Sequence, residues 1–358
     1  MDCFRGFGMK QLIKFIFGVF YVNLFLIAGC ASASGTDKSV ASKTSVQKII
    51  AIGDIHGDFG AYQTVMRDAG LIDLDGRWIG GRTILVQTGD VPDRGPDTLK
   101  IIEDLRALEK QARKTGGDVI TLVGNHEAMN MTGDLRYVHA GEYSAFVTPK
   151  SASLRDRLYK ANKEAIETFY REKNPTLSAG MIKAKWEETT PLGKLEHQKA
   201  WGANGAIGRW VKKNPVAVLV DGNLFAHGGF SQKYTVYSIA DMNKAAKKAL
   251  KKQDTSPDSI INDPLGPLWY RGLVPGSKQN DGALAPDAEV DLVLATYGAQ
   301  RIIVGHTPAK TGVKSSYGGK LIQIDTGMSE HYGGTRSFLR IENGSVFAHD
   351  NGVVRKLN

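Results

Sequence analysis

Cysteine is almost absent from this chain of 358 residues: only Cys3 and Cys30 occur, both near the N-terminus. The remainder of the chain therefore has no disulfide, no thiolate zinc site and no nucleophilic cysteine. Catalysis through a cysteine thiolate is excluded. Any metal that the chain binds must be held by Asp, Asn, Glu and His side chains.

Internal repeats are also missing, and the composition is that of a globular protein, with 42% hydrophobic and 23% charged residues. The length permits one large α/β domain or two smaller ones. The net charge of +9 favours anionic ligands or an anionic membrane face as partners. A solvated surface without a partner has the same charge balance, so charge alone does not identify a function.

The chain has one long apolar run, at its N-terminus. There, Phe15 to Ile27 follow the positive residues Lys10 and Lys14, and this run is shorter than the ~20 apolar residues of a comfortable bilayer span. It ends in LIAGC (residues 26–30), followed by small polar residues. The pattern resembles a bacterial lipobox, in which signal peptidase cuts before a cysteine that receives a diacylglyceryl group.

This resemblance implies a signal peptide at residues 1–29 and a lipidated tether at 30–44, with Cys30 anchored in the membrane. The protein would be an exported bacterial lipoprotein on the periplasmic side. Ala31 is not the aspartate that retains lipoproteins at the inner membrane, which favours the outer membrane. An uncleaved N-terminal anchor is the alternative, and translation from Met9 would preserve the signal.

Three apolar segments each run directly into polar residues. Residues 47–53, 83–88 and 118–123 are predicted strands that stop at Asp54, at Asp90 and at GNHE (124–127). Helices are predicted between them, at 62–69 and 98–114. In βαβ architecture the loops after the strands meet in one crevice, which is where sites are built.

Later segments complete the predicted fold. Residues 140–213 break the strand rhythm and are interpreted as a mainly helical cap insert. Strands return at 217–220 and before His227 and His306, and late antiparallel strands are expected at 321–325 and 337–347. We expect an α/β (by some schemes α+β) fold at residues 45–350: a two-sheet β-sandwich flanked by helices.

The polar residues at the strand ends form a plausible metal-binding set. Asp54 and His56 are two apart in an extended segment, so both can face one cation. Asp90 has two oxygens with which to bridge two metals, and a second site needs an amide oxygen and imidazoles, namely Asn125, His227 and His306. This mixture of ligands suits two divalent or trivalent ions such as Mn, Fe or Zn. Two such ions about 3.5–4 Å apart can activate a bridging water as hydroxide for in-line attack at phosphorus.

Other motif residues suit phosphate chemistry. Arg94, in the sequence DRG, can donate two hydrogen bonds to phosphate oxygens. His126 adjoins Asn125 and is the candidate general acid for the leaving oxygen, and Asp93 can hold its imidazole in the charged form. Histidines outside the motifs are interpreted as structural: His139, His197, His331 and His349.

Five motifs occur in order: GDIHGD (53–58), GDVPDRG (89–95), GNHE (124–127), HGG (227–229) and GH (305–306). Together they resemble the phosphoprotein phosphatase branch of the calcineurin-like metallophosphoesterases. The resemblance implies the calcineurin-like fold, metal ligands at Asp54, His56, Asp90, Asn125, His227 and His306, and an acid pair and phosphate clamp at Asp93, His126 and Arg94. It also implies a second phosphate arginine, for which Arg271 in WYRG is the candidate.

The details of the motifs are similar to those of Shewanella-like protein phosphatases, in particular DRGPDT, GNHEAMN and GHT. This similarity implies a phosphoprotein or phosphopeptide substrate, with phosphotyrosine favoured and phosphoserine/threonine still open. Alternative functions are a diadenosine tetraphosphate hydrolase, a phosphatase that scavenges small phosphate esters, and a metal-binding surface lipoprotein without activity. A nucleic-acid substrate is not expected, because no basic groove interleaved with aromatic residues is visible.

Overall fold

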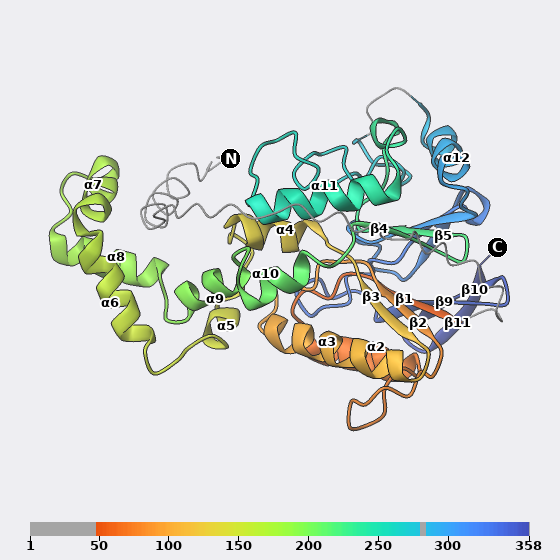
Figure 1. Ribbon diagram of the computed structural model, residues 1–358, viewed down its shortest axis with the longest axis horizontal. Coiled ribbons are helices and arrows are strands. Elements are labelled where there is room, and N and C mark those ends of the chain that lie inside the picture. Colours follow the sequence, from red (N-terminus) through yellow and green to blue (C-terminus); the bar gives the residue numbers. More distant parts are fainter. Residues whose placement is uncertain (1–47, 280–283, 358) are drawn as a thin grey trace, which may run out of the picture. The chain divides into compact units, whose positions relative to one another are not determined.

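The computed structural model describes residues 48–279 and 284–357 of the chain, in two β-sheets with helices around them (Figure 1). The predicted signal peptide and the tether, residues 1–44, lie outside this described part. Within it, no helix is both long and apolar enough to cross a bilayer.

The first sheet has the strand order β11-β10-β9-β1-β2-β3. Its strands are β1 (Ile49–Ile52), β2 (Ile84–Gln87), β3 (Asp118–Thr121), β9 (Ser337–Glu342), β10 (Ser345–Asp350) and β11 (Val353–Leu357). β1, β2 and β3 are parallel, as their alternation with predicted helices in βαβ order indicated, whereas β9 and β10 form an antiparallel hairpin that adds to β1. A turn at Asn343-Gly344 joins this hairpin, and Asn343 has the left-handed φ of 50° that such a turn requires.

The second sheet has the order β4-β5-β6-β8-β7. Its strands are β4 (Ala217–Val220), β5 (Asn223–Ala226), β6 (Arg301–Val304), β7 (Lys314–Ser316) and β8 (Leu321–Gln323). One expectation is corrected here, because β8 was predicted as an antiparallel strand and is parallel to its inner neighbour β6. Only its pairing with the short edge strand β7 is antiparallel. An apolar run reports burial and not strand direction, so the sequence could not make this distinction.

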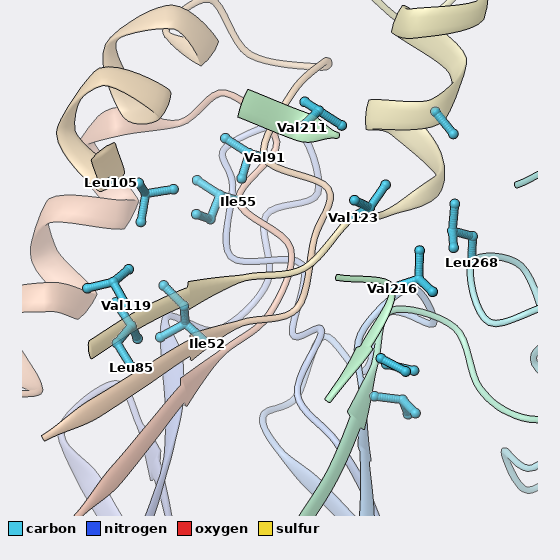
Figure 2. Packing of buried hydrophobic residues seen from close by; sticks show 14 of the residues in the cluster. Ile52, Ile55, Leu85, Val91, Leu105, Val119, Val123, Val211, Val216 and Leu268 are labelled. Carbon is cyan, nitrogen blue, oxygen red and sulfur yellow. The ribbon is translucent and has the colours of Figure 1, made fainter. Parts of the chain in front are cut away.

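Two apolar layers hold the sandwich together. Alternate residues of β1 point to opposite faces, and Ile49 and Ala51 meet Phe225 and Ile303 of the second sheet in a core between the sheets. Ile50 and Ile52 face the other way, toward the helices. Figure 2 shows Ile52, Leu85 and Val119 of this outer face beside Leu105 of α3.

Helices cover the outer faces of the sheets. They are α2 (Phe59–Asp68), α3 (Thr98–Lys114), α4 (Asn125–Thr132), α11 (Ile239–Lys252) and α12 (Pro286–Tyr297), with short 3-10 turns η1 (Gln232–Tyr234) and η2 (Tyr317–Gly319). α2 and α3 lie against the first sheet (Figure 1). The Asp58 carboxylate accepts the Ala61 N–H and caps α2, while α3 buries the apolar stripe that includes Leu105 and Leu108.

The range predicted to be a helical insert, 140–213, contains α5 (Ala140–Ser144), α6 (Ser151–Ala161), α7 (Lys163–Lys173), α8 (Ala179–Thr189), α9 (Lys194–Trp201) and α10 (Ala206–Val211). Residues 154–189 form a compact unit of their own, with a small core of Tyr159, Ile166, Leu177 and Ile182. Residues 47–153 and 190–358 belong to the second unit, which contains both sheets.

Candidate metal centre

The predicted site residues come together beyond the carboxyl ends of the strands. His56 and Asp90 follow β1 and β2, and His306 follows β6, each with a left-handed φ between 49° and 65°. Such backbone is unusual for residues with side chains and marks turns that are fixed by their surroundings. Gly305 shows how tightly the loops approach, since a Cβ at this position would lie 2.4 Å from an Asp54 carboxylate oxygen.

One group of donors surrounds His56. Its Nδ1 donates to the Pro92 carbonyl at 3.2 Å, which leaves the Nε2 lone pair free. That nitrogen lies 3.9 Å from a carboxylate oxygen of Asp54 and 3.8 Å from one of Asp90. Burial lowers the pKa of His56 to about 3, so the ring is neutral, as a metal ligand must be.

A second group surrounds His227. Its Nδ1 donates to the Thr88 carbonyl at 2.9 Å, which turns Nε2 toward the other side chains. Nε2 lies 2.9 Å from Asn125 Oδ1, 3.1 Å from His306 Nδ1 and 3.3 Å from an Asp90 oxygen. Nitrogen and oxygen atoms that converge in this way fit a cation at their centre.

Asp90 belongs to both groups. Potential ligand atoms of Asp90, His56 and His126 lie within 4.8 Å of one another, and so do those of Asp90, His227 and His306. The carboxylates are buried too, and burial, with repulsion from Asp325 and Asp90, raises the pKa of Asp54 well above its usual range. Nitrogen and oxygen donors around a shared carboxylate, crowded enough to need positive charge, fit a dinuclear metal centre.

His126 stands beside this centre with a carboxylate partner. Its Nδ1 is 2.5 Å from Asp93 Oδ2, and its Nε2 is 3.8 Å from an Asp90 oxygen. The second oxygen of Asp93 accepts a hydrogen bond from the Asn130 side chain at 2.9 Å. Burial lowers the pKa of His126, but Asp90 and Asp93 outweigh it and raise that pKa to about 9. The imidazole is therefore protonated at neutral pH.

The two predicted arginines reach the centre from different loops. The Arg94 guanidinium lies 3.9 Å from the centroid of the Tyr137 ring, and its buried Nε has no hydrogen-bond partner in the described part of the chain. Arg271 donates through Nη1 to the His306 carbonyl and to Thr307 Oγ1. Arg271 is thereby tied to the backbone of the histidine loop.

Two residues of the site, Glu127 and Tyr332, had no role assigned to them from the sequence. Glu127, the last residue of GNHE, accepts hydrogen bonds from the backbone N–H groups of Asp90, Val91 and Gly124 and so holds the loop that carries Asp90. Its place inside the GNHE motif was the available signal, although the motif by itself assigns no role. No sequence signal pointed to Tyr332. Its ring centroid lies 5.2 Å from that of His56, although the two residues are 276 positions apart in the chain.

Comparison with known proteins places this geometry in context. The sequence profile of calcineurin-like phosphoesterases matches residues 47–310. An uncharacterised protein of Schizosaccharomyces pombe is 32% identical over 348 residues, covering 94% of this chain and 90% of the relative. Shewanella-like protein phosphatase 2 of Arabidopsis thaliana is 29% identical over 289 residues, covering 79% and 72%.

Among solved structures, the cold-active protein-tyrosine phosphatase of a psychrophilic Shewanella species superposes with a TM-score of 0.65 at 26% identity, covering 88% of this chain and 81% of that one. A protein serine/threonine phosphatase from Saccharomyces cerevisiae superposes with a TM-score of 0.50 at 16% identity, covering 87% and 80%. The second likeness extends only to the fold.

Proposed function

The chain belongs to the calcineurin-like phosphoesterase family and is a metal-dependent protein phosphatase, and from this premise we propose that it acts on phosphotyrosine. The observation that carries the proposed chemistry is the convergence of two donor groups on Asp90, with a protonated His126 only 3.8 Å from the shared carboxylate. The solved structure named a tyrosine phosphatase supports the choice of phosphotyrosine.

In this proposal, two metal ions would be held by Asp54, His56, Asp90, Asn125, His227 and His306. When bound, the ions supply Lewis acidity that activates water near neutral pH and neutralises negative charge on the phosphoryl group. The donor set of carboxylate, amide and imidazole favours Mn, Fe or Zn. Backbone carbonyls on the Nδ1 atoms of His56 and His227 orient both rings with Nε2 toward Asp90, where the metals would be held.

The remaining side chains handle the substrate. Arg94 and Arg271 bind phosphoryl oxygens through their guanidinium groups, since Arg94 stacks on Tyr137, whose ring lies 5.2 Å from that of His126, and Arg271 is tied to the His306 loop. His126 Nε2 gives its proton to the leaving phenolate oxygen, while Asp93 on Nδ1 stabilises the charged ring before transfer. No protein nucleophile is required, which agrees with the lack of cysteine in the body of the chain.

The test is a comparison of substrates. The purified chain, loaded separately with Mn, Fe or Zn, is assayed with a phosphotyrosine peptide, a phosphoserine peptide and diadenosine tetraphosphate, and bound metal is quantified. Faster metal-dependent phosphate release from the phosphotyrosine peptide is the expected result. Preference for phosphoserine would overturn the choice of residue, and turnover of the dinucleotide alone would overturn the phosphatase.

We also propose that the mature protein is a periplasmic lipoprotein attached to the outer membrane through Cys30. The support is the LIAGC sequence and the absence of an aspartate after it. Mass spectrometry of the N-terminal peptide should find diacylglyceryl on Cys30, and Cys30→Ala should release the protein from the membrane fraction. An unmodified Cys30 in the mature protein, or an unprocessed N-terminus, would refute the anchor.

A further inference from the structure

Glu142 connects helix α5 to the loop that carries Asp93. It lies on α5, is only 1% exposed, and its Oε1 accepts the backbone N–H of Asp93 at 2.8 Å. Asp93 has a φ of 74°, in the left-handed region that a non-glycine residue adopts only when its surroundings impose it. Glu142 therefore holds the backbone at a position that would otherwise relax.

Asp93 transmits this constraint to His126. One carboxylate oxygen of Asp93 contacts His126 Nδ1 at 2.5 Å, and the other accepts from Asn130 at 2.9 Å. Both oxygens are thus engaged by α4, and the side chain has no freedom to compensate for a shift of its own backbone. A displaced Asp93 would turn the His126 ring and move Nε2, the atom that faces Asp90.

His197 lies behind Glu142. This histidine is on α9, is fully buried, and its Nε2 is 3.6 Å from Glu142 Oε2. The rings of Tyr143 and Phe146 lie edge-on to it, with centroids 5.2 and 5.1 Å away. Packing from α9 thus confines the Glu142 carboxyl on the side opposite Asp93, as the support of a functional side chain requires.

Both members of this supporting pair are neutral near pH 7. Burial, followed by the charge of Asp93, raises the pKa of Glu142 to about 8, and burial lowers the pKa of His197 to about 4. A protonated carboxyl beside Asp93 avoids repulsion between two buried carboxylates. It also has nearly the shape and the acceptor oxygen of a glutamine side chain.

We propose that Glu142, backed by His197, is a positioning residue that sets the orientation of His126 toward the leaving oxygen, and so makes helix α5 a part of the catalytic apparatus. The inference rests on the proposed role of His126 as general acid.

The experiment compares two substrates that differ in their need for an acid. Phenyl phosphate has a poor leaving group, whereas 4-nitrophenyl phosphate leaves readily without a proton. In the metal-loaded full chain, Glu142→Ala should lower kcat about 10²-fold on phenyl phosphate and less than about 10-fold on 4-nitrophenyl phosphate, because misplacing a catalytic group by ~1 Å costs rate only where the group acts. KM and metal content should not change. Glu142→Gln, which keeps the acceptor oxygen, should restore kcat on both substrates to within about threefold.

Asp104→Ala is the matched control. This carboxylate also ties two helices together, accepting from Tyr62 at 2.8 Å between α3 and α2, but it has no link to Asp93. The control should lower both rates equally or not at all. Equal losses on both substrates in Glu142→Ala, or a Glu142→Gln variant as impaired as the alanine variant, would overturn the inference.

The two proposals fail in distinguishable ways. If His126→Ala itself shows no dependence on the leaving group, the general-acid role is wrong and the inference falls with it. If His126→Ala shows the dependence and Glu142→Ala does not, only the positioning role of Glu142 is refuted. His197→Phe, which keeps the aromatic packing, should lower the phenyl phosphate rate less than Glu142→Ala does. A larger loss would contradict the proposal that His197 acts only through Glu142.

Discussion

Two buried histidine–carboxyl pairs meet at the Asp93 loop, and their histidines differ in protonation state. His126 and Asp93 are in direct contact at 2.5 Å, and the histidine pKa is raised to about 9. His197 and Glu142 are 3.6 Å apart, the histidine pKa is lowered to about 4, and the carboxyl pKa is raised to about 8. His126 is therefore protonated at neutral pH, whereas Glu142 and His197 are both neutral.

The difference comes from the neighbours of each pair. Burial penalises charge in both, but His126 has Asp90 as an additional carboxylate, whereas His197 is enclosed by aromatic rings. A histidine beside a carboxyl group can therefore provide an acid in one place and a rigid support in another. Residue identity alone does not separate these roles; distance and surroundings do.

The largest loss of activity is expected from Asp90→Asn, which acts on the His126–Asp93 pair from outside. It removes a ligand shared by both donor groups and the strongest charge that holds the proton on His126. We expect loss of bound metal, and a fall in kcat beyond the ~10²–10⁴-fold that a general acid contributes alone. Metal analysis and phosphotyrosine peptide turnover check this. A variant that retains activity would contradict the two-metal centre.

His126→Ala removes the acid and leaves the ligands. Metal content should be unchanged, and kcat on a phosphotyrosine peptide should fall about 10²–10³-fold, within the range of general-acid catalysis. His197→Ala provides the comparison from the neutral pair, because it should cost less activity while destabilising the fold. Metal loss from His126→Ala would mean that this residue is a ligand, since its ring lies within reach of Asp90.

Asp93→Asn should lower the pKa of His126, toward the lowered pKa of His197. Because Asp93 helps to raise the pKa of His126, its neutralisation lowers that pKa. A general acid must be protonated, so activity is lost as pH rises through its pKa, and this alkaline limb should move to lower pH in the variant. At about pH 8 we expect kcat to fall roughly 10–100-fold, less than in His126→Ala. An alkaline limb that stays in place would exclude Asp93 as its cause.

The smallest expected effect is a change in the free energy of unfolding caused by Glu142→Gln. The folded-state pKa of Glu142 is raised from 4.5 to about 8, so the folded protein binds more protons than the unfolded chain between these values. The contribution of Glu142 to the free energy of unfolding is therefore most favourable at low pH and is lost as pH rises toward 8. Glutamine has no proton to lose, and relative to wild type the variant should gain on the order of 1 kcal/mol in free energy of unfolding between about pH 5 and pH 9. Denaturant titrations at both pH values measure this, and parallel curves would show that Glu142 stays ionised.

Much of the candidate site could be predicted because the strands and their loops are local features. β4 and α3 begin and end at the predicted residues, and β1, β2 and β3 end within a few residues of their predicted ends. Polar residues placed directly after buried parallel strands must gather at one edge of the sheet. The proximity of Asp54, Asp90 and Asn125 follows from this rule.

Other features depend on contacts between distant segments. The direction of β8, the place of Tyr332 beside His56 and the bond from Glu142 to Asp93 each join parts of the chain with no local signal. His197 was interpreted as structural, and its sequence gives no indication that it backs a carboxyl of the Asp93 loop. Such contacts depend on how loops and helices pack, and no periodicity encodes them.

The sequence by itself determined the chemistry: the supply of oxygen and imidazole donors, the lack of a thiolate, and the acid and arginine candidates. It also determined that these residues follow buried strands. Tertiary structure decided which nitrogen of each histidine faces the centre, which carboxyl stays charged, and which helix of the insert holds the Asp93 loop. The physical reason is that ligand type is a property of one side chain, whereas protonation and orientation depend on every group packed around it.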